Sequence, residues 1–256
     1  MNAKVWLVGA GPGDPELLTL KAVRALREAD VVLIDDLVNV AVLEHCPTAR
    51  IIPVGKRGGC RSTPQAFIHR LMLRYVRQGK CVVRLKGGDP CIFGRGGEEA
   101  QWLRQYGVEV ELVNGITAGL AGATRCDIPL TLRGVARGVT LVTAHTQDDS
   151  QLNWQALAQG GTTLVVYMGV AKLGEIRDQL LAGGMAVDTP VAMIENASLP
   201  QQRECRSDLL GMEDEAHRFQ LKSPAILVIG AVAAAEAEAK AALERELPAM
   251  TAGQFA

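Results

Sequence analysis

The sequence predicts an α/β protein of two domains, with a mainly parallel N-terminal sheet and a mixed C-terminal sheet. The chain has 256 residues, which is long for one hydrophobic core and sufficient for two modest domains. Hydrophobic residues make up 48% of it and aromatic residues 4%, and the apolar residues stand in short runs of Ala, Val, Leu and Ile, as in buried parallel strands. These runs alternate with segments of helical periodicity, which is typical of α/β domains.

The N-terminal half begins with a buried strand at residues 5–8 and a turn rich in glycine and proline. Asp14 then suits the N-cap of a helix and Pro15 its first position, and apolar residues recur at helical intervals through Leu26. Polar residues follow several strands of this half, and open parallel sheets bind ligands at that edge. Further strands are expected at residues 31–34, 51–54, 81–85 and 109–113, with helices at 63–78 and through Trp102.

A stretch of small residues from 114 onward ends in Ile-Pro-Leu-Thr-Leu-Arg at residues 128–133, where we place the domain junction. The predicted domains are residues 1–134 and 135–246, followed by a frayed tail at 247–256. A hairpin-like pair near the end of the second domain predicts a mixed sheet there. Its strands are expected at residues 139–143, 163–167, 191–195, 204–207 and 225–229, with a helix at 171–181.

The composition excludes several classes of protein. Few aromatic residues disfavour nucleic-acid binding by base stacking, and the formal net charge is −1. The apolar runs are too short to span a bilayer, and no signal peptide is visible, so a soluble cytoplasmic protein is expected. The six cysteines form no C-x-x-C and the four histidines no H-E-x-x-H, which indicates reduced thiols and no metal.

The segment between Arg50 and Arg95 is strongly basic, with Asp89 as its only acid. An anionic ligand is one interpretation. A solvated helix face is the alternative for three arginines at helical spacing, Arg70, Arg74 and Arg77. The better ligand candidates are the cations in glycine-rich turns, Lys56, Arg57, Arg61 and Arg95.

Residues 82–99 carry an apolar strand into a glycine-rich turn with charges of both signs. Gly87 and Gly88 allow a ligand to approach the backbone, and Asp89 supplies an acceptor. This turn therefore predicts a small-molecule site. The earlier turn at residues 9–14 lacks the third glycine of a dinucleotide fingerprint and the lysine of a Walker loop, so a tight structural turn and a ligand contact both stay open there.

The stretches Arg-Leu-Lys-Gly-Gly-Asp-Pro at residues 84–90 and Phe-Gly-Arg-Gly-Gly-Glu-Glu at 93–99 resemble the signature of the tetrapyrrole methyltransferases, which use S-adenosylmethionine. Residues 9–21 are similar to the N-terminal motif of that family. Further matches lie at residues 35, 54–57, 115–118, 128–131, 167–169, 195–196 and 223–225, so the resemblance covers nearly the whole chain. It implies the class III methyltransferase fold, with two α/β domains, and a homodimer.

The resemblance also implies an activity, namely two successive carbon methylations of uroporphyrinogen III, through precorrin-1 to precorrin-2, on the route to sirohaem, cobalamin or haem d1. The dehydrogenase and chelatase domain of fused sirohaem synthases has no counterpart here, so we expect the reaction to stop at the dimethylated product. Two alternatives are a later precorrin methyltransferase and a non-catalytic tetrapyrrole or nucleotide sensor. Intact Asp35, Lys56 and Asp89 argue against the sensor, which needs no acid or base.

By the same resemblance, the S-adenosylmethionine pocket lies between the domains. Asp89 can accept a hydrogen bond from a ribose hydroxyl or an amino group, and Met168 can pack on adenine. Core packing would explain Met168 and Ala225 equally well without the family match. The cofactor-binding residues implied are Pro12, Gly87, Gly88, Asp89, Ile92, Thr117, Ala118, Met168, Ala197 and Ala225.

Carbon methylation requires an aligned nucleophilic carbon and the loss of a proton from the ring system. The resemblance assigns Asp35 as proton acceptor and Lys56 as proton donor. Taken alone, a helix-capping aspartate and an exposed lysine are the commoner explanations of such residues.

The substrate carries eight carboxylates, and arginine pairs with carboxylates in bidentate geometry. Arg95, Arg133 and Arg57 fit this role, and Arg95 is also an alternative proton relay. The resemblance adds Glu98, His145 and Met168 to the residues that face the tetrapyrrole. Departures from the family pattern at Cys91, Arg125, Asp127 and Ala197 leave the proposed catalytic groups intact and affect local pocket shape.

Overall fold

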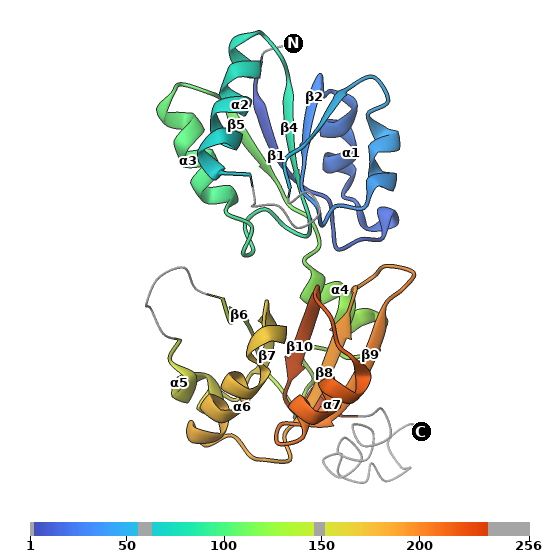
Figure 1. Cartoon of the computed structure of the whole chain (residues 1–256), viewed down its shortest axis with the longest axis vertical. Coiled ribbons are helices and arrows are strands. Elements are labelled where there is room, and N and C mark those ends of the chain that lie inside the picture. Colours follow the sequence, from blue (N-terminus) through green and yellow to red (C-terminus); the bar gives the residue numbers. More distant parts are fainter. Residues whose placement is uncertain (1–2, 56–62, 146–151, 235–256) are drawn as a thin grey trace, which may run out of the picture. The chain divides into compact units, whose positions relative to one another are not determined.

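The computed structural model describes residues 3–55, 63–145 and 152–234 (Figure 1). By its internal contacts the chain divides into two compact units. The first comprises Met1–Ala121 with Ser198–Pro200, and the second comprises Gly122–Ala197 with Gln201–Ala256. This division falls inside helix α4 (Ala118–Arg125). The junction expected after residue 134 stays a prediction, and the tail at 247–256 lies outside the described residues.

The first unit contains a five-stranded sheet in which every neighbouring pair is parallel, as the sequence predicted. The strand bounds agree with the expected ones to within about one residue. In spatial order the strands are β3 (Arg50–Pro53), β2 (Val31–Ile34), β4 (Val82–Lys86), β1 (Val5–Gly9) and β5 (Val110–Val113).

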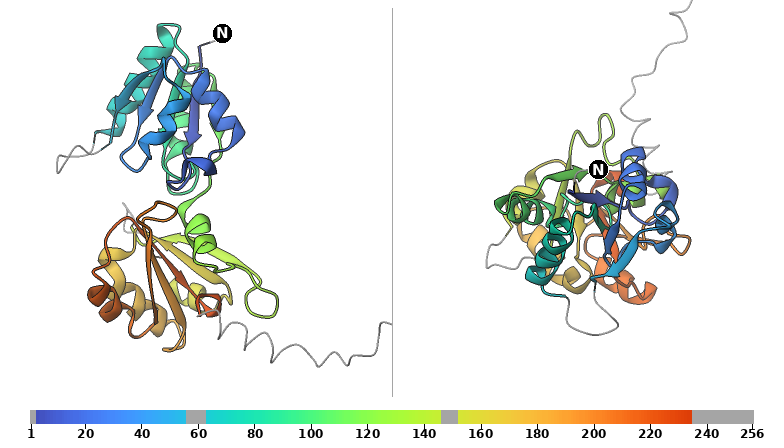
Figure 2. Two further views of the ribbon diagram at one scale, coloured as in Figure 1. Left: turned by 90° about the vertical axis from the view of Figure 1, so that its right-hand side faces the viewer. Right: turned by 90° about the horizontal axis from the view of Figure 1, so that it is seen from above.

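Helices cover both faces of this sheet (Figures 1 and 2). Alternate strand residues such as Trp6 and Val83 pack with α1 (Leu20–Arg27) and the 3-10 segment η2 (Val40–His45). The intervening residues, such as Leu7 and Val82, pack with α2 (Gln65–Arg77) and α3 (Gly96–Gln105). Both faces are therefore buried, which explains why the strands read as nearly continuous apolar runs.

The first helix begins later than the sequence predicted. Asp14 does act as an N-cap, since its Oδ1 accepts the Glu16 N–H at 3.0 Å, but it caps only the short 3-10 segment η1 (Pro15–Leu17). Leu18 then adopts an extended conformation, and Thr19 caps α1 by accepting the Ala22 N–H at 3.1 Å. The expected helix thus divides into two pieces because a second capping side chain restarts it.

The second unit contains a mixed sheet of five strands, which confirms the expectation for this half. Strands β6 and β7 are parallel, whereas β10 runs antiparallel to β7 and β8, and β9 antiparallel to β8. In spatial order they are β6 (Val139–Thr143), β7 (Thr163–Tyr167), β10 (Ala225–Ile229), β8 (Pro190–Glu195) and β9 (Arg203–Asp208).

One face of the second sheet packs on α5 (Trp154–Gln159), α6 (Leu173–Ala182) and α7 (Met212–Phe219). Of these, only α6 was predicted. Short 3-10 segments, η3 (Val170–Lys172) and η4 (Ala231–Ala233), follow β7 and β10. The far part of α4 packs close to Ile194 and Ala197, because a Cβ added at Gly122 would lie 3.1 Å from the Ala197 Cβ.

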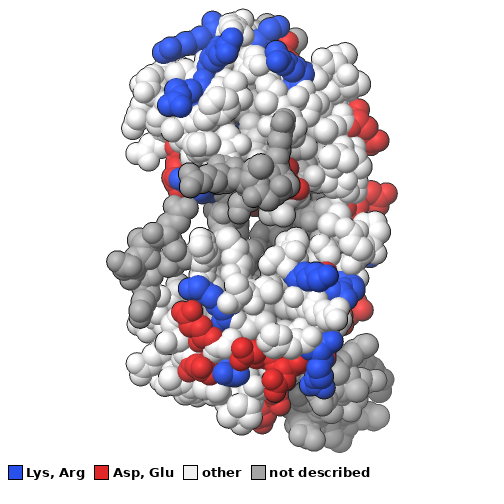
Figure 3. All heavy atoms as spheres, viewed as in Figure 1, with Lys and Arg blue, Asp and Glu red and all other residues white. Residues whose placement is uncertain are grey.

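Figure 3 shows basic side chains gathered at the end of the first unit where α2 finishes. Arg70, Arg74 and Arg77 are all exposed, which supports the interpretation of a solvated helix face. Among the described residues, no helix is long and apolar enough to cross a membrane.

The buried Glu195 at the end of β8 generates a prediction about stability and pH. Burial raises its pKa, but hydrogen bonds from the Lys222 N–H at 2.9 Å and Arg203 Nη2 at 2.7 Å outweigh burial, so the pKa is lowered. A lowered pKa stabilises the fold above the unfolded-state value, and this stabilisation disappears as the pH falls through the folded-state value. We expect Glu195→Gln to reduce the free energy of unfolding by about 1 kcal/mol at neutral pH.

Urea unfolding at a series of pH values checks this prediction, with the exposed Glu175→Gln as the control. The difference between wild type and Glu195→Gln must shrink as the solution becomes acidic. A difference that stays constant with pH contradicts it.

Candidate active site

Three glycine backbones pack against one another at the carboxyl edge of the parallel sheet. Gly9 ends β1, and Gly88 and Gly115 follow β4 and β5. A Cβ added at Gly9 would lie 2.5 Å from both the Gly115 nitrogen and the Gly88 oxygen. Gly11 and Gly88 also exchange two backbone hydrogen bonds, of 3.2 and 2.7 Å. The signature turn is therefore attached directly to the loops after β1 and β5.

Asp89 holds this arrangement together from inside. Its side chain is buried, with 6% of the residue exposed. Oδ1 accepts the Cys91 N–H at 2.7 Å, and Oδ2 accepts the Gly115 N–H and Asn114 Nδ2, each at 3.1 Å. A carboxylate has about four acceptor positions, so one remains for a further donor.

The other cofactor candidates of the first unit lie around this glycine contact. A Cβ at Gly88 would lie 3.7 Å from the Thr117 Cα and 3.9 Å from the Ala118 nitrogen. Thr117 is buried, whereas the remaining candidates Pro12, Gly87, Ile92 and Ala118 are half-buried. The structure thus brings the seven cofactor candidates of the first unit into neighbouring loops and the start of α4.

In the second unit, four predicted residues lie at one edge of the mixed sheet. Met168 follows β7 and His145 lies two residues beyond the parallel strand β6, whereas Ala225 opens β10 and Ala197 lies two residues beyond β8. Ala225 pairs with Glu195 and Ile226 pairs with Tyr167. The start of β10 therefore lies beside the ends of β7 and β8. Met168 is 49% exposed and has a positive φ of 56°.

Arg133 lies elsewhere in that unit. It belongs to a turn closed by the Leu132–Ala136 bridge, ahead of the start of β6. The neighbouring Gly138 carbonyl accepts the Thr163 N–H, so this turn lies at the edge where β6 and β7 begin. The structure does not bring Arg133 together with His145 and Met168 within the unit.

Asp35 follows β2 and points toward the strand β4, where it meets two buried cations. Its Oδ1 lies 2.6 Å from Arg84 Nη2 and its Oδ2 lies 3.5 Å from Lys86 Nζ. The Asp35 side chain is 28% exposed, so it reaches the surface of the sheet edge. The predicted proton donor Lys56, and Arg57 and Arg61 with it, lie outside the described residues.

The two adjacent glutamates at the start of α3 have different environments. Glu98 is exposed and binds Arg95 Nη2 at 2.7 Å, and this hydrogen bond lowers the pKa of Glu98. Glu99 is fully buried, and its Oε1 lies 3.3 Å from Lys86 Nζ and 3.5 Å from Arg84 Nε. Sequence reasoning selected Glu98 and missed Glu99, Arg84 and Lys86 as members of the site.

A signal for the missed residues existed in the sequence. Arg84 and Lys86 stand inside an otherwise apolar buried strand, where a charged side chain requires a partner. Glu99 shares a helix face with Leu103, four residues further on, so it points to the same side as the apolar residues of α3. A charge on the buried face of a helix could have been matched to the charges in the strand.

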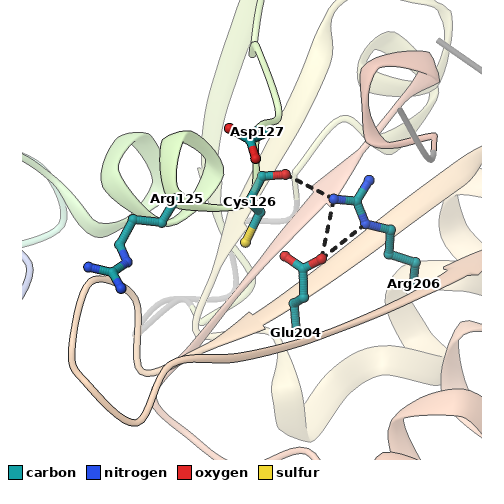
Figure 4. A pocket seen from close by; sticks show the side chains of 5 residues that line it. All are labelled: Arg125, Cys126, Asp127, Glu204 and Arg206. Carbon is teal, nitrogen blue, oxygen red and sulfur yellow. Dashed lines mark hydrogen bonds and ion pairs between the residues drawn. The ribbon is translucent and has the colours of Figure 1, made fainter. Parts of the chain in front are cut away.

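A separate polar pocket of the second unit is lined by Arg125, Cys126, Asp127, Glu204 and Arg206 (Figure 4). The Arg206 guanidinium donates to Glu204 Oε1 at 3.3 Å and to the Cys126 carbonyl at 3.0 Å, and Figure 4 shows Arg125 directed away from them. Burial raises the pKa of the Cys126 thiol to about 12, so this thiol is unreactive. None of the predicted site residues lines this pocket.

Within the described ranges, no group of His, Cys, Asp or Glu could hold a metal ion.

Comparison with known families identifies the class of protein. A family model described as Tetrapyrrole (Corrin/Porphyrin) Methylases matches residues 4–210. The chain belongs to this family, which confirms the resemblance found in the sequence. The chain is 80% identical over 235 residues to the uroporphyrinogen-III C-methyltransferase of Pseudomonas fluorescens. This match covers 92% of this chain and 95% of that protein. It is 75% identical over 232 residues to the enzyme of the same name from Pseudomonas aeruginosa. That match covers 91% of this chain and 95% of that protein.

Solved structures show the same fold. The uroporphyrin-III C-methyltransferase of Thermus thermophilus, complexed with S-adenosyl homocysteine, has a TM-score of 0.77 and 43% sequence identity, covering 90% of this chain and 98% of that one. A cobalt precorrin-4 methyltransferase has a TM-score of 0.82 and 27% sequence identity. The match covers 91% of this chain and 97% of that one. These structures confirm the two-sheet α/β fold class.

The role of Asp89 as a clamp generates a prediction. Asp89→Ala leaves two backbone N–H groups and the Asn114 amide without their acceptor, and hydrogen bonds to a charged group contribute about 1.5 to 3 kcal/mol each. We expect a loss of about 3 kcal/mol in the free energy of unfolding, measured with urea. The exposed Glu44→Ala serves as a control that leaves stability unchanged. Equal stability of Asp89→Ala and wild type would show that the clamp is unimportant.

Proposed function

We propose that this chain is an S-adenosylmethionine-dependent methyltransferase that converts uroporphyrinogen III to precorrin-2 in two successive steps, through precorrin-1. The observation that carries this proposal is 75–80% identity to two uroporphyrinogen-III C-methyltransferases along nearly their whole length. The signature loop supports it, because the structure places that loop at the edge where parallel sheets bind ligands. Identity to the cobalt precorrin-4 enzyme is far lower, at 27%.

The residues of the sheet edge fit the cofactor. Gly87 lies so close to the loop after β2 that an added Cβ would be 3.0 Å from the Leu37 Cβ, so only glycine leaves space there. Small half-buried residues and exposed backbone suit an adenosine, and Asp89 retains an acceptor position for one of its donors. When bound, S-adenosylmethionine supplies an electrophilic methyl group. The second unit would contribute Met168, Ala197 and Ala225, whose small or apolar side chains suit the adenine ring.

We assign proton acceptance to Asp35. It is the partly exposed member of the charged group at the sheet edge, and Arg84 and Lys86 hold its carboxylate in place. Lys56 is the proposed proton donor on the basis of its position in the sequence, directly after Gly55. An added Cβ at Gly55 would run into the Asp36 carboxylate, so the loops after β2 and β3 are adjacent.

Arg95 is proposed to bind substrate carboxylates, together with Glu98, His145 and Met168. Arg133 stays a prediction from the family resemblance, because it lies at the opposite edge of the second sheet from His145 and Met168. Arg95 has a left-handed conformation at the start of α3 and is 43% exposed. Its present partner is Glu98, so binding a substrate carboxylate requires Arg95 to share or exchange that partner. Charge-assisted bidentate contacts of this type favour arginine over lysine.

The reaction is tested by incubating the purified protein with uroporphyrinogen III and isotope-labelled S-adenosylmethionine. Mass analysis of the pigment must show the addition of one and then two labelled methyl groups. An unmodified pigment, or methylation of a later precorrin only, would overturn the proposal.

Asp35→Asn separates proton transfer from binding. A lost general base costs about a hundredfold or more in rate. We therefore expect Asp35→Asn to turn over about a hundredfold more slowly at saturating substrate, with an unchanged dissociation constant for S-adenosyl homocysteine by calorimetry. Arg95→Ala is the contrasting variant, because it should weaken substrate binding and leave cofactor binding unchanged. A wild-type rate for both Asp35→Asn and Lys56→Met would make Arg95 the preferred proton relay.

We further propose that the protein acts as a cytoplasmic homodimer and serves sirohaem, cobalamin or haem d1 synthesis. The family resemblance supports the dimer. One chain has a mass of 27.3 kDa, and light scattering at micromolar concentration should give twice that mass. A monomeric mass would contradict the proposed dimer.

A further inference from the structure

Three charged side chains lie in the interior of the first unit, where apolar residues are expected. Arg84 and Lys86 alternate along β4 with 2% and 6% of each residue exposed, on the face that packs against α2 and α3. Glu99 of α3 is 0% exposed and lies opposite them. Burial of this much charge is unfavourable unless each group is paired, so the arrangement requires an explanation.

Asp35 and Glu99 share the same two cations. Arg84 places Nη2 at 2.6 Å from Asp35 Oδ1 and Nε at 3.5 Å from Glu99 Oε1. Lys86 Nζ lies between the carboxylates, at 3.5 Å from Asp35 Oδ2 and 3.3 Å from Glu99 Oε1. Two cations and two carboxylates balance one another, and Asp35 is the end of the group that reaches solvent.

Helices α2 and α3 fix the inner end of this group. Gln65 Nε2 donates to Glu99 Oε1 at 2.6 Å and lies 3.1 Å from His69 Nε2. Burial lowers the pKa of His69, so this ring is neutral at neutral pH, and it stacks on Trp102 with centroids 4.9 Å apart. Glu99 Oε2 has no hydrogen-bond partner among the described residues.

We propose that Glu99 is a positioning residue for the methylation, because it holds Arg84 and Lys86 in a shared arrangement and thereby sets how they bind Asp35. Without the Glu99 charge, both cations would turn fully onto Asp35. Cations turned fully onto Asp35 would occupy the acceptor positions of its carboxylate that a proton from the substrate needs. The inference rests on the proposed function and on Asp35 as its proton acceptor.

The test is a double-mutant cycle of Glu99→Gln and Asp35→Asn, measured as kcat and KM for uroporphyrinogen III. In the wild-type background, Glu99→Gln should lower kcat about tenfold, with KM and the affinity for S-adenosyl homocysteine within about twofold of wild type. In the Asp35→Asn background, it should cause no further loss beyond about twofold. The same loss in both backgrounds, or a wild-type kcat for Glu99→Gln, overturns the inference.

Two controls keep the result decisive. Glu111→Gln removes another carboxylate that bridges two lysines, Lys4 at 3.2 Å and Lys21 at 2.6 Å, and should leave kcat unchanged. If thermal melting shows that Glu99→Gln does not fold, Lys86→Met replaces it in the same cycle. An equal loss of kcat from Lys86→Met in the wild-type and Asp35→Asn backgrounds then overturns the inference. Wild-type turnover is measured first. Its absence refutes the proposed function and this inference together, whereas normal turnover with independent losses refutes this inference alone.

Discussion

The close approach of glycine backbones at the carboxyl edge of the parallel sheet is the constraint on which the site depends. Gly9, Gly88 and Gly115 come from three strands, and any side chain at Gly9 or Gly115 would collide with backbone atoms. Because a collision with backbone cannot be relieved by a rotamer change, the loops either meet in this way or not at all. The Asp89 carboxylate then connects the loop after β4 with the loop after β5 by hydrogen bonds from inside. The position of every candidate around the signature turn follows from this contact.

A second constraint is electrostatic. The strand β4 carries two cations into the interior, and a buried cation that lost its partner would destabilise the unit. Asp35 and Glu99 meet this requirement from opposite sides, one at the surface and one in the core. Structural pairing and the proposed proton chemistry therefore use the same carboxylate. This dual use explains why the proposed catalytic aspartate lies next to a buried arginine.

The second unit places three of its sequence-predicted residues at one edge of its sheet. Met168, Ala197 and Ala225 end or begin three strands that alternate in direction, so residues far apart in the sequence arrive at one edge. Positive φ angles at Met168, Asn196 and Ser198 show that the chain turns sharply there. This edge carries small or apolar side chains, whereas the sheet edge of the first unit carries the charged group around Asp35.

Sequence patterns alone predicted both sheets, the ten strands described in them, the signature turn and the family, because apolar runs and glycine motifs are local patterns. It did not predict α5 or α7, since helices of six and eight residues span too few turns to show a clear periodic pattern. It predicted one continuous helix after Asp14, whereas the structure divides it, because Thr19 acts as a second N-cap and restarts the helix. Which of the two adjacent glutamates joins Asp35 through Arg84 and Lys86 was settled by the fold, which selects Glu99. The physical reason is that ion pairing in the interior depends on which helix face meets which strand, and that match is made by packing.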